Sequence, residues 1–375
     1  MQILKHPITG ANGPVTAELV SLHFGPLDQG KKVYIQAALH ADEVPGMLVA
    51  QFLRAELASL EANGRLHGEI VLVPAANPLG LAQAVQGTPF GRFDLTTGIN
   101  FNRGFRHVGP EITPLLVQRL GQDEAANILI VREQACQAVA RWNPMTDSDS
   151  LKKILLGLAI DADIVLDLHC DNEAMVHLYT GTALANALEP LPAILGAHAV
   201  LVTSEAGQEP FDEACSRLWW EIAATYRGLF PIPSACLAAT VELRGEMDVD
   251  YDTARADAAG IIQFLALKGM VGLQQAGPVV LPPAMCQPTP LEGVEPLLAP
   301  QAGILVYQRA LGEDVRAGDV IADVIDPVSG SVIQVRASVA GRFFARSAHR
   351  HVLRGMNIGK ISGKTAYRTG NLMSL

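Results

Sequence analysis

Up to about residue 270, the chain alternates short apolar runs with stretches whose apolar residues recur at helical spacing. Continuous apolar runs of this length are typical of buried strands, and they occur at 32–39, 70–75, 163–168, 198–203 and 236–243. Helical spacing predicts helices over 46–57, 150–159, 211–229 and about 252–267. Pro45 suits the first turn of the first helix, because the N–H that it lacks is not needed there. Strands that alternate with such helices predict an α/β fold with a mostly parallel mixed sheet flanked by helices.

The composition changes near residue 273. Residues 273–300 are rich in Pro and Gly, which is typical of a linker or an irregular crossing. Beyond them, 303–361 breaks into short β-prone runs separated by Gly and Asp, which predicts a small all-β domain. We therefore predict two domains, a large α/β domain over 1–275 and a small β-rich domain over 276–375.

One motif within the small domain suggests a shape. The sequence GEDVRAGDVIADVIDPVSG at 312–330 resembles the hammerhead of biotinyl and lipoyl carriers, which is barrel-like. A carrier needs an exposed lysine at a hairpin tip to hold its prosthetic group. No lysine lies between Lys268 and Lys360, so the sequence excludes the carrier function even if the shape is shared.

Composition and charge exclude several classes of protein. With 49% hydrophobic and 18% charged residues, the chain is too apolar to be disordered. A net charge of −10 without a basic block argues against nucleic acid as a partner. No apolar run reaches membrane-span length, and the N-terminus does not read as a secretory signal, so we expect no membrane partner. The 5 cysteines lack a CxxC pair, which predicts reduced thiols in a cytoplasmic protein, and the composition permits a homo-oligomer.

Three polar segments follow predicted strands and carry the candidate chemistry. His40 and Glu43 lie between a buried strand and a helix, His169 ends the strand 163–168, and Glu242 ends the strand 236–243. Ligands bind at the carboxyl ends of strands in an open α/β sheet. Two histidines and one carboxylate are a common ligand set for catalytic zinc, and a further carboxylate could act as general base.

Each segment also has an ordinary interpretation. The chain has 10 histidines, and a histidine followed three residues later by a glutamate arises often by chance in a chain of 375 residues. Cys170 follows His169 directly and could be a zinc ligand, but neighbours on a strand point to opposite faces. The shared position of the three segments at carboxyl ends of one predicted sheet favours the metal site.

The order of these motifs resembles the succinylglutamate desuccinylase/aspartoacylase family of the zinc carboxypeptidase-like superfamily. The similarity extends over roughly residues 30–270 and implies one zinc ion per chain in a zinc-hydrolase catalytic domain over 1–275. It implies roles for seven residues: His40, Glu43 and His169 as metal ligands, Glu242 as the catalytic glutamate, Asn102 and Arg103 as the pair that grips the substrate carboxylate, and Arg92 as the candidate for the arginine that polarises the scissile carbonyl.

The chain departs from the family pattern in two places. Asn100 replaces the aspartate that the family often has two positions before the Asn-Arg pair. Residues 109–150 have the character of an added helical segment, for which the resemblance gives no place.

The resemblance implies a zinc-dependent amidohydrolase that removes an acyl group from a small N-acyl amino acid, as a deacylase, desuccinylase or aspartoacylase does. Two alternatives stay open: a metallocarboxypeptidase acting on short peptides, and a non-catalytic protein that binds a metal or ligand. Glu242 argues against the second alternative, because a binding site needs no base.

Overall fold

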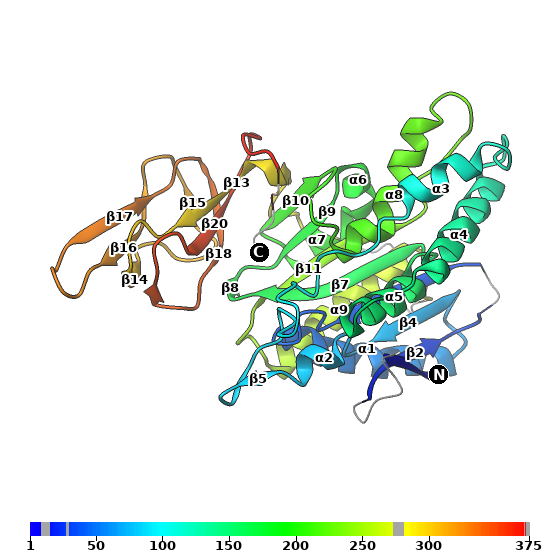
Figure 1. The fold of residues 1–375 in the computed structure, drawn as a ribbon, viewed down its shortest axis with the longest axis horizontal. Helices are drawn as coiled ribbons and strands as arrows, with labels where there is room; N and C mark the ends of the chain where they lie inside the picture. The colour runs from blue at the N-terminus through cyan, green and yellow to red at the C-terminus, as the bar shows by residue number, and fades with distance from the viewer. Residues whose placement is uncertain (9–15, 28–29, 273–280, 371, 373–375) are drawn as a thin grey trace.

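The structure, a computed structural model, is built around a nine-stranded mixed sheet (Figure 1). It describes residues 1–8, 16–27, 30–272, 281–370 and 372. The sheet has the order β1-β2-β4-β3-β7-β11-β9-β10-β12. The bounds are β1 Gln2–Ile8, β2 Ala17–Phe24, β3 Lys32–Ala37, β4 Glu69–Val73, β7 Ile164–Asp171, β9 His177–Gly181, β10 Ala199–Thr203, β11 Leu237–Gly245 and β12 Pro288–Pro290. The pairs β3–β4, β3–β7, β7–β11, β9–β10 and β10–β12 are parallel, which confirms the predicted mostly parallel sheet.

The central strands β3, β7 and β11 are buried on both faces. Successive side chains of a strand point to opposite faces. Tyr34 and Val165 accordingly join the hydrophobic cluster on one face, and Ile35 and Leu166 join the cluster on the other. Burial of such side chains contributes about 1.5–3 kcal/mol each. The centre of the sheet is therefore a rigid base for the segments that follow these strands.

Helices cover both faces of this sheet. Buried side chains of α1, α7 and α9 belong to one cluster, and those of α3, α4, α5 and α8 belong to the other. The bounds are α1 Pro45–Ala62, α2 Pro78–Leu81, α3 Gly109–Leu116, α4 Glu124–Arg141, α5 Asp147–Ala159, α6 Ala185–Leu188, α7 Pro190–Leu195, α8 Phe211–Thr225 and α9 Tyr251–Leu267. None of the helices in the described part of the chain is long and apolar enough to cross a membrane.

The C-terminal region forms two antiparallel sheets, as predicted, and they lie beside the helix-covered sheet (Figure 1). One has the order β13-β20-β18-β15, and the other has the order β17-β16-β14-β19. The bounds are β13 Val294–Leu298, β14 Gly303–Tyr307, β15 Asp314–Val315, β16 Val320–Ile325, β17 Val332–Arg336, β18 Gly341–Arg346, β19 His351–Val352 and β20 Asn357–Gly363.

The C-terminal region and the large sheet exchange short strands. β8 (Glu173–Ala174), directly after β7, pairs with β18, whereas β12 extends the large sheet beside β10. Lys360 Nζ lies 2.5 Å from Asp171 Oδ2, and Arg346 Nε lies 2.6 Å from Glu173 Oε2. These contacts fix the C-terminal sheets next to the carboxyl end of β7.

The structure also differs from the sequence prediction. The hairpin β1–β2 and the short strand β9 were not predicted. Residues 109–150 form α3, α4 and the start of α5, which cover one face of the sheet. Part of 273–300 was predicted as a linker, but 288–290 and 294–298 are strands, and the prolines of β12 are tolerated because this strand lies at the sheet edge. The predicted boundary at 275/276 lies outside the described residues, so the division into domains stays a prediction.

Candidate active site

The predicted metal ligands lie at neighbouring carboxyl ends of the large sheet. Strands β3 and β11 run parallel to β7 on either side of it, so the segments that follow them meet at one edge. His40 and Glu43 lie in the turn between β3 and α1, and His169 lies near the end of β7. Ala38, just before this turn, has a φ of 59°, a conformation that costs an L residue free energy. The surrounding fold therefore holds the turn in place.

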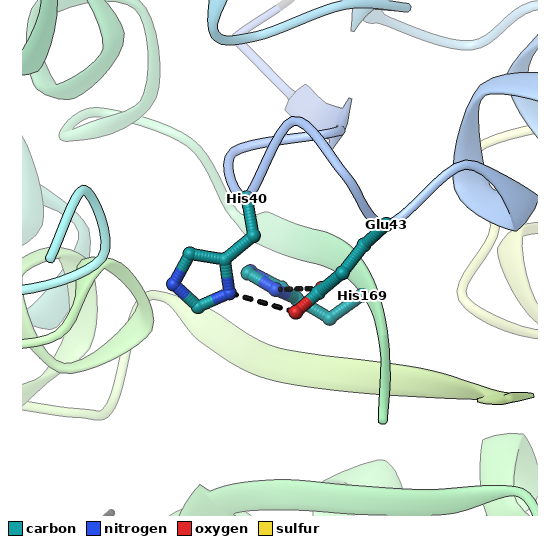
Figure 2. A group of neighbouring side chains, drawn as sticks. All are labelled: His40, Glu43 and His169. Carbon is teal, nitrogen blue, oxygen red and sulfur yellow. Dashed lines mark hydrogen bonds and ion pairs between the residues drawn. The ribbon is translucent and has the colours of Figure 1, made fainter. Parts of the chain in front are cut away.

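The side chains of His40, Glu43 and His169 converge on one point (Figure 2). The distance from His40 Nδ1 to Glu43 Oε1 is 2.8 Å, and the distance from His169 Nδ1 to Glu43 Oε2 is 2.7 Å. All three residues are buried. Their potential ligand atoms lie within 4.8 Å of one another, so the group could hold a metal ion.

The outer nitrogen of each imidazole faces an oxygen atom. His40 Nε2 lies 2.7 Å from Asn100 Oδ1, and His169 Nε2 lies 2.9 Å from Asp167 Oδ2. An oxygen acceptor there favours the tautomer with the proton on Nε2, which leaves the lone pair of Nδ1 directed at Glu43. Asn100, which replaces the aspartate of the family pattern, thus still supplies an acceptor to His40.

This arrangement fits a divalent metal. With the proton of each ring on Nε2, two imidazole lone pairs and a carboxylate face one another, and a metal cation between them would satisfy all three. Two histidines and one glutamate are also a known ligand set of catalytic zinc sites that keep one position open. Cys170 contributes its backbone N–H, which donates to Glu43 Oε2 at 3.1 Å. Its thiol does not belong to the group that could hold the metal.

The electrostatics of the three residues favour a cation among them. Burial lowers the pKa of His40, and the Arg92 guanidinium lowers it further. Burial opposes the charged form of Glu43, but the two imidazoles outweigh it and hold the pKa of this carboxyl well below its usual range. Burial likewise opposes a charge on His169, but Asp167 and Glu43 outweigh it and hold the pKa of this imidazole well above its usual value. Without a metal, His169 therefore carries a proton that it donates to Glu43, and a metal ion held by the three residues would supply a positive charge at the same place.

Glu242 lies beside the three residues. In the pairing of β11 with β7, its Cα is opposite that of His169, and its side chain lines the same cavity as His40 and His169. Its Oε2 is buried and has no hydrogen-bond partner among the described residues. Burial, with the charge of Glu43, raises the pKa of Glu242 to about 8. A carboxyl with such a pKa can both accept and donate a proton near neutral pH.

Two arginines give the cavity a positive side. Arg92 Nη1 lies 3.1 Å from Glu43 Oε1, and Arg103 is buried with its Nη1 donating to the carbonyl of Asn102 at 2.6 Å. The side chain of Asn102 is oriented by Phe211, whose backbone N–H donates to Asn102 Oδ1 at 2.9 Å. Burial, with the charge of Arg92, lowers the pKa of Arg103 to about 10. Paired guanidinium groups favour an anionic ligand such as a carboxylate.

The cavity that joins these groups encloses about 540 Å³, part of it open to solvent. Sequence reasoning missed several residues that line it: Tyr179, Thr180, Leu201, Thr203, Ala206, Pro210, Asp212, Glu213, Thr240 and Leu291. The position of Thr240, two residues before Glu242 on one strand, could have indicated it, since residues i and i+2 share a face. The other nine lie on elements that only the fold brings to the cavity.

Comparison with known proteins supports the family resemblance. Residues 29–124 match the model of the succinylglutamate desuccinylase/aspartoacylase catalytic domain. A comparison with curated proteins found no match.

Solved structures resemble the chain over nearly its whole length. A protein of Shewanella frigidimarina, named as a succinylglutamate desuccinylase/aspartoacylase, has 25% identity and a TM-score of 0.84, with 96% of this chain and 97% of that chain covered. A member of the same family from Shewanella amazonensis has 28% identity and a TM-score of 0.79, with 97% and 99% covered.

A more distant structure shares the fold. The product-bound ectoine utilization protein of Ruegeria pomeroyi has 16% identity and a TM-score of 0.63, with 96% of this chain and 94% of that chain covered. Together with the match of residues 29–124, these structures confirm that the chain resembles the succinylglutamate desuccinylase/aspartoacylase family.

Proposed function

We propose that this protein is a zinc-dependent amidohydrolase that removes the acyl group from a small N-acyl amino acid. One observation carries the proposal: two residues of the group that could hold a metal, His40 and His169, line a single cavity with Glu242 and the buried Arg103. The Oε2 of Glu242 has no hydrogen-bond partner among the described residues. The family resemblance supports the same class of reaction.

His40, Glu43 and His169 would hold the zinc ion. When bound, zinc supplies Lewis acidity, which acidifies water and polarises a carbonyl oxygen. The contacts of His40 with Asn100 and of His169 with Asp167 fix the orientation of both rings.

Glu242 is proposed as the general base and acid. Its unpaired Oε2 would take a proton from the attacking water, and the hydroxyl would form the new bond to the acyl carbon. As the C–N bond breaks, the same carboxyl would return the proton to the leaving nitrogen. The products are a free carboxylic acid and an amino acid, so one water is consumed for each amide cleaved.

Arg103 and Asn102 are proposed to bind the free carboxylate of the substrate. A planar guanidinium can hold a carboxylate through two parallel hydrogen bonds, which fixes direction as well as charge. Arg92 lies beside the metal ligand Glu43, with 3.1 Å between Arg92 Nη1 and Glu43 Oε1. It is proposed to stabilise the negative charge that develops on the acyl oxygen.

A substrate panel with metal control tests this function. The protein is analysed for zinc and then assayed with N-acetyl and N-succinyl amino acids and with short peptides that have free C-termini. We expect release of amine from the N-acyl amino acids, loss of activity with a chelator and its return with added zinc. Cleavage of the peptides alone would favour a carboxypeptidase, and tight zinc binding without any hydrolysis would favour a non-catalytic protein. The cytoplasmic location and a homo-oligomer stay predictions.

A further inference from the structure

Two carboxylic acids that the proposed reaction does not use line the same cavity. Asp212 and Glu213 are the second and third residues of α8, and they are 6% and 4% exposed. They line the cavity together with Arg103, His169 and Glu242. The cavity is therefore positive on the side of the arginines and acidic at the start of α8.

Glu213 is only half satisfied in its hydrogen bonding. Its Oε1 accepts a hydrogen bond from the backbone N–H of Ala206 at 2.6 Å, whereas its Oε2 is buried without a hydrogen-bond partner among the described residues. Within the described part of the chain, Glu213 also makes no ion pair. Arg217 lies one turn further along α8, but its ion pairs are with Glu205, Glu209 and Glu221.

A role in stabilising the first turn of α8 explains why Glu213 is acidic but does not explain why it is buried. Acidic residues in the first turn of a helix stabilise it, and exposed carboxylates are sufficient for this effect. Burial of an unpaired carboxylate costs free energy, which is recovered only when a donor or a cation is supplied. Burial, with the neighbouring Asp212, accordingly raises the pKa of Glu213 to about 8. A cation in the cavity would favour the charged form of this carboxyl.

We propose that Glu213 and Asp212 form a subsite for a primary ammonium group of the substrate. This rests on the proposed function, and it defines the substrate more closely: an N-acyl amino acid whose free carboxylate lies at Arg103 and whose free amino group lies at Glu213. A primary ammonium has three N–H donors and can supply the partner that Glu213 Oε2 lacks among the described residues, whereas a methyl group in its place leaves this oxygen unsatisfied. Selectivity that depends on buried polar groups is large, because the wrong substrate leaves them without partners.

The ammonium could belong to the amino acid or to the acyl part, and two arms of one experiment separate these sources. The first arm compares Nα-acetylornithine with N-acetylnorvaline, which differ only in the terminal amino group. The second arm compares glycyl-norvaline with N-acetylnorvaline, where the amino group is on the acyl part. In one of the two arms we expect kcat/KM to be at least about tenfold higher for the ammonium substrate.

Glu213→Gln tests whether this residue carries the preference. We expect the ratio of kcat/KM between ammonium and neutral substrates to fall about tenfold, because the carboxylate charge is removed at almost constant shape. Glu205→Gln is the matched control, since its side chain is 57% exposed and paired with Arg217, and it should keep the ratio of the wild type. If Glu213→Gln does not fold, Asp212→Asn is used in its place.

A binding measurement separates this inference from the proposed function. Metal-free protein is titrated with ornithine and with norvaline, and its Tm is recorded. Where the first arm shows the preference, ornithine should raise Tm more than norvaline in the wild type and no more than norvaline in Glu213→Gln. Where the second arm shows it, glycyl-norvaline and N-acetylnorvaline take the places of ornithine and norvaline. A wild type that prefers neutral substrates, or a variant that keeps the full preference, overturns the ammonium subsite and leaves the hydrolase intact. Preferential binding of ornithine without hydrolysis of any substrate would instead reject the hydrolase and support the subsite.

Discussion

Two groups of histidine and glutamate are built into the same sheet, and they differ in how their atoms are arranged. At the carboxyl ends of β3 and β7, both inner imidazole nitrogens face the single carboxylate of Glu43. At the other side of the sheet, β1, β2 and β4 carry a linear chain. Ser21 Oγ lies 2.7 Å from His6 Nε2 and 2.8 Å from His23 Nε2, and His23 Nδ1 lies 2.7 Å from Glu69 Oε1.

The difference shows that residue types alone do not make a metal site. In the linear chain a hydroxyl stands between the two rings, and a hydroxyl both donates and accepts, so the chain needs no ion. In the converging group of His40, Glu43 and His169, two ring nitrogens face one carboxylate with no hydroxyl between them, so a proton or a metal ion has to lie between the rings and the carboxylate. Among the described residues only His40, Glu43 and His169 form a group that could hold a metal, and the two histidines line the cavity that contains Glu242.

The largest effect is expected when one histidine is removed from each group and the bound zinc is compared. His169→Ala should reduce bound zinc from about one per chain to almost none and abolish hydrolysis, because two ligands hold the ion too weakly. His23→Ala should keep its zinc and its turnover. Elemental analysis of both purified variants checks this. A fully loaded His169→Ala protein would contradict the ligand assignment.

The next largest effect is expected for Glu242, which lies outside the converging group. Glu242→Gln should lower kcat by about 10²- to 10⁴-fold, the usual contribution of general acid–base catalysis, while zinc is retained. Glu69→Gln, in the linear chain, is the matched control and should leave kcat unchanged. Steady-state kinetics with parallel zinc analysis measure both. Wild-type turnover in Glu242→Gln would rule out its role as the base.

His177, a buried histidine outside both groups, gives a prediction about how the stability of the protein depends on pH. His177 is buried beside Phe344, and burial lowers its pKa to about 4. The unfolded chain takes up this proton near pH 6.5 and the folded protein only near pH 4, so the unfolded state binds more protons in between. Stability should therefore decrease as pH falls from 6.5 to 4, by up to about 3 kcal/mol.

Denaturant unfolding at several pH values measures this dependence. His177→Gln should lose a large part of the slope between pH 6.5 and 4, whatever its absolute stability. An equal slope in wild type and variant would show that other groups cause the acid sensitivity.

The smallest effect is expected for the hydroxyl of the linear chain. Ser21→Ala should lower the free energy of unfolding by about 1–2 kcal/mol, because it leaves Nε2 of the buried His23 without its partner. Zinc content and kcat should not change. If Ser21→Ala instead reduced the zinc content, the separation of the two groups would be wrong.

Much of the fold and part of the site could be predicted from local sequence. The apolar runs of β3, β7 and β11 and the helical spacing after Pro45 depend only on neighbouring residues, so their periodicity identifies them. Because parallel strands end at one edge, the polar residues after them could be expected to meet there. The strands β1 and β9 were missed because β1 is a half-exposed edge strand that contains Pro7 and β9 mixes polar and apolar residues, so neither shows a clear apolar run.

The sequence by itself determined the fold class and the residues suited to bind a metal at strand ends. Only the tertiary structure decided that Nδ1 of both His40 and His169 faces Glu43, that Asn100 and Asp167 orient the two rings, and that the start of α8 lines the same cavity. The physical reason is distance along the chain. Periodicity reports which face of an element is buried. The direction of a ring nitrogen, or the lack of a partner for Glu213 Oε2 among the described residues, depends on atoms contributed by remote segments.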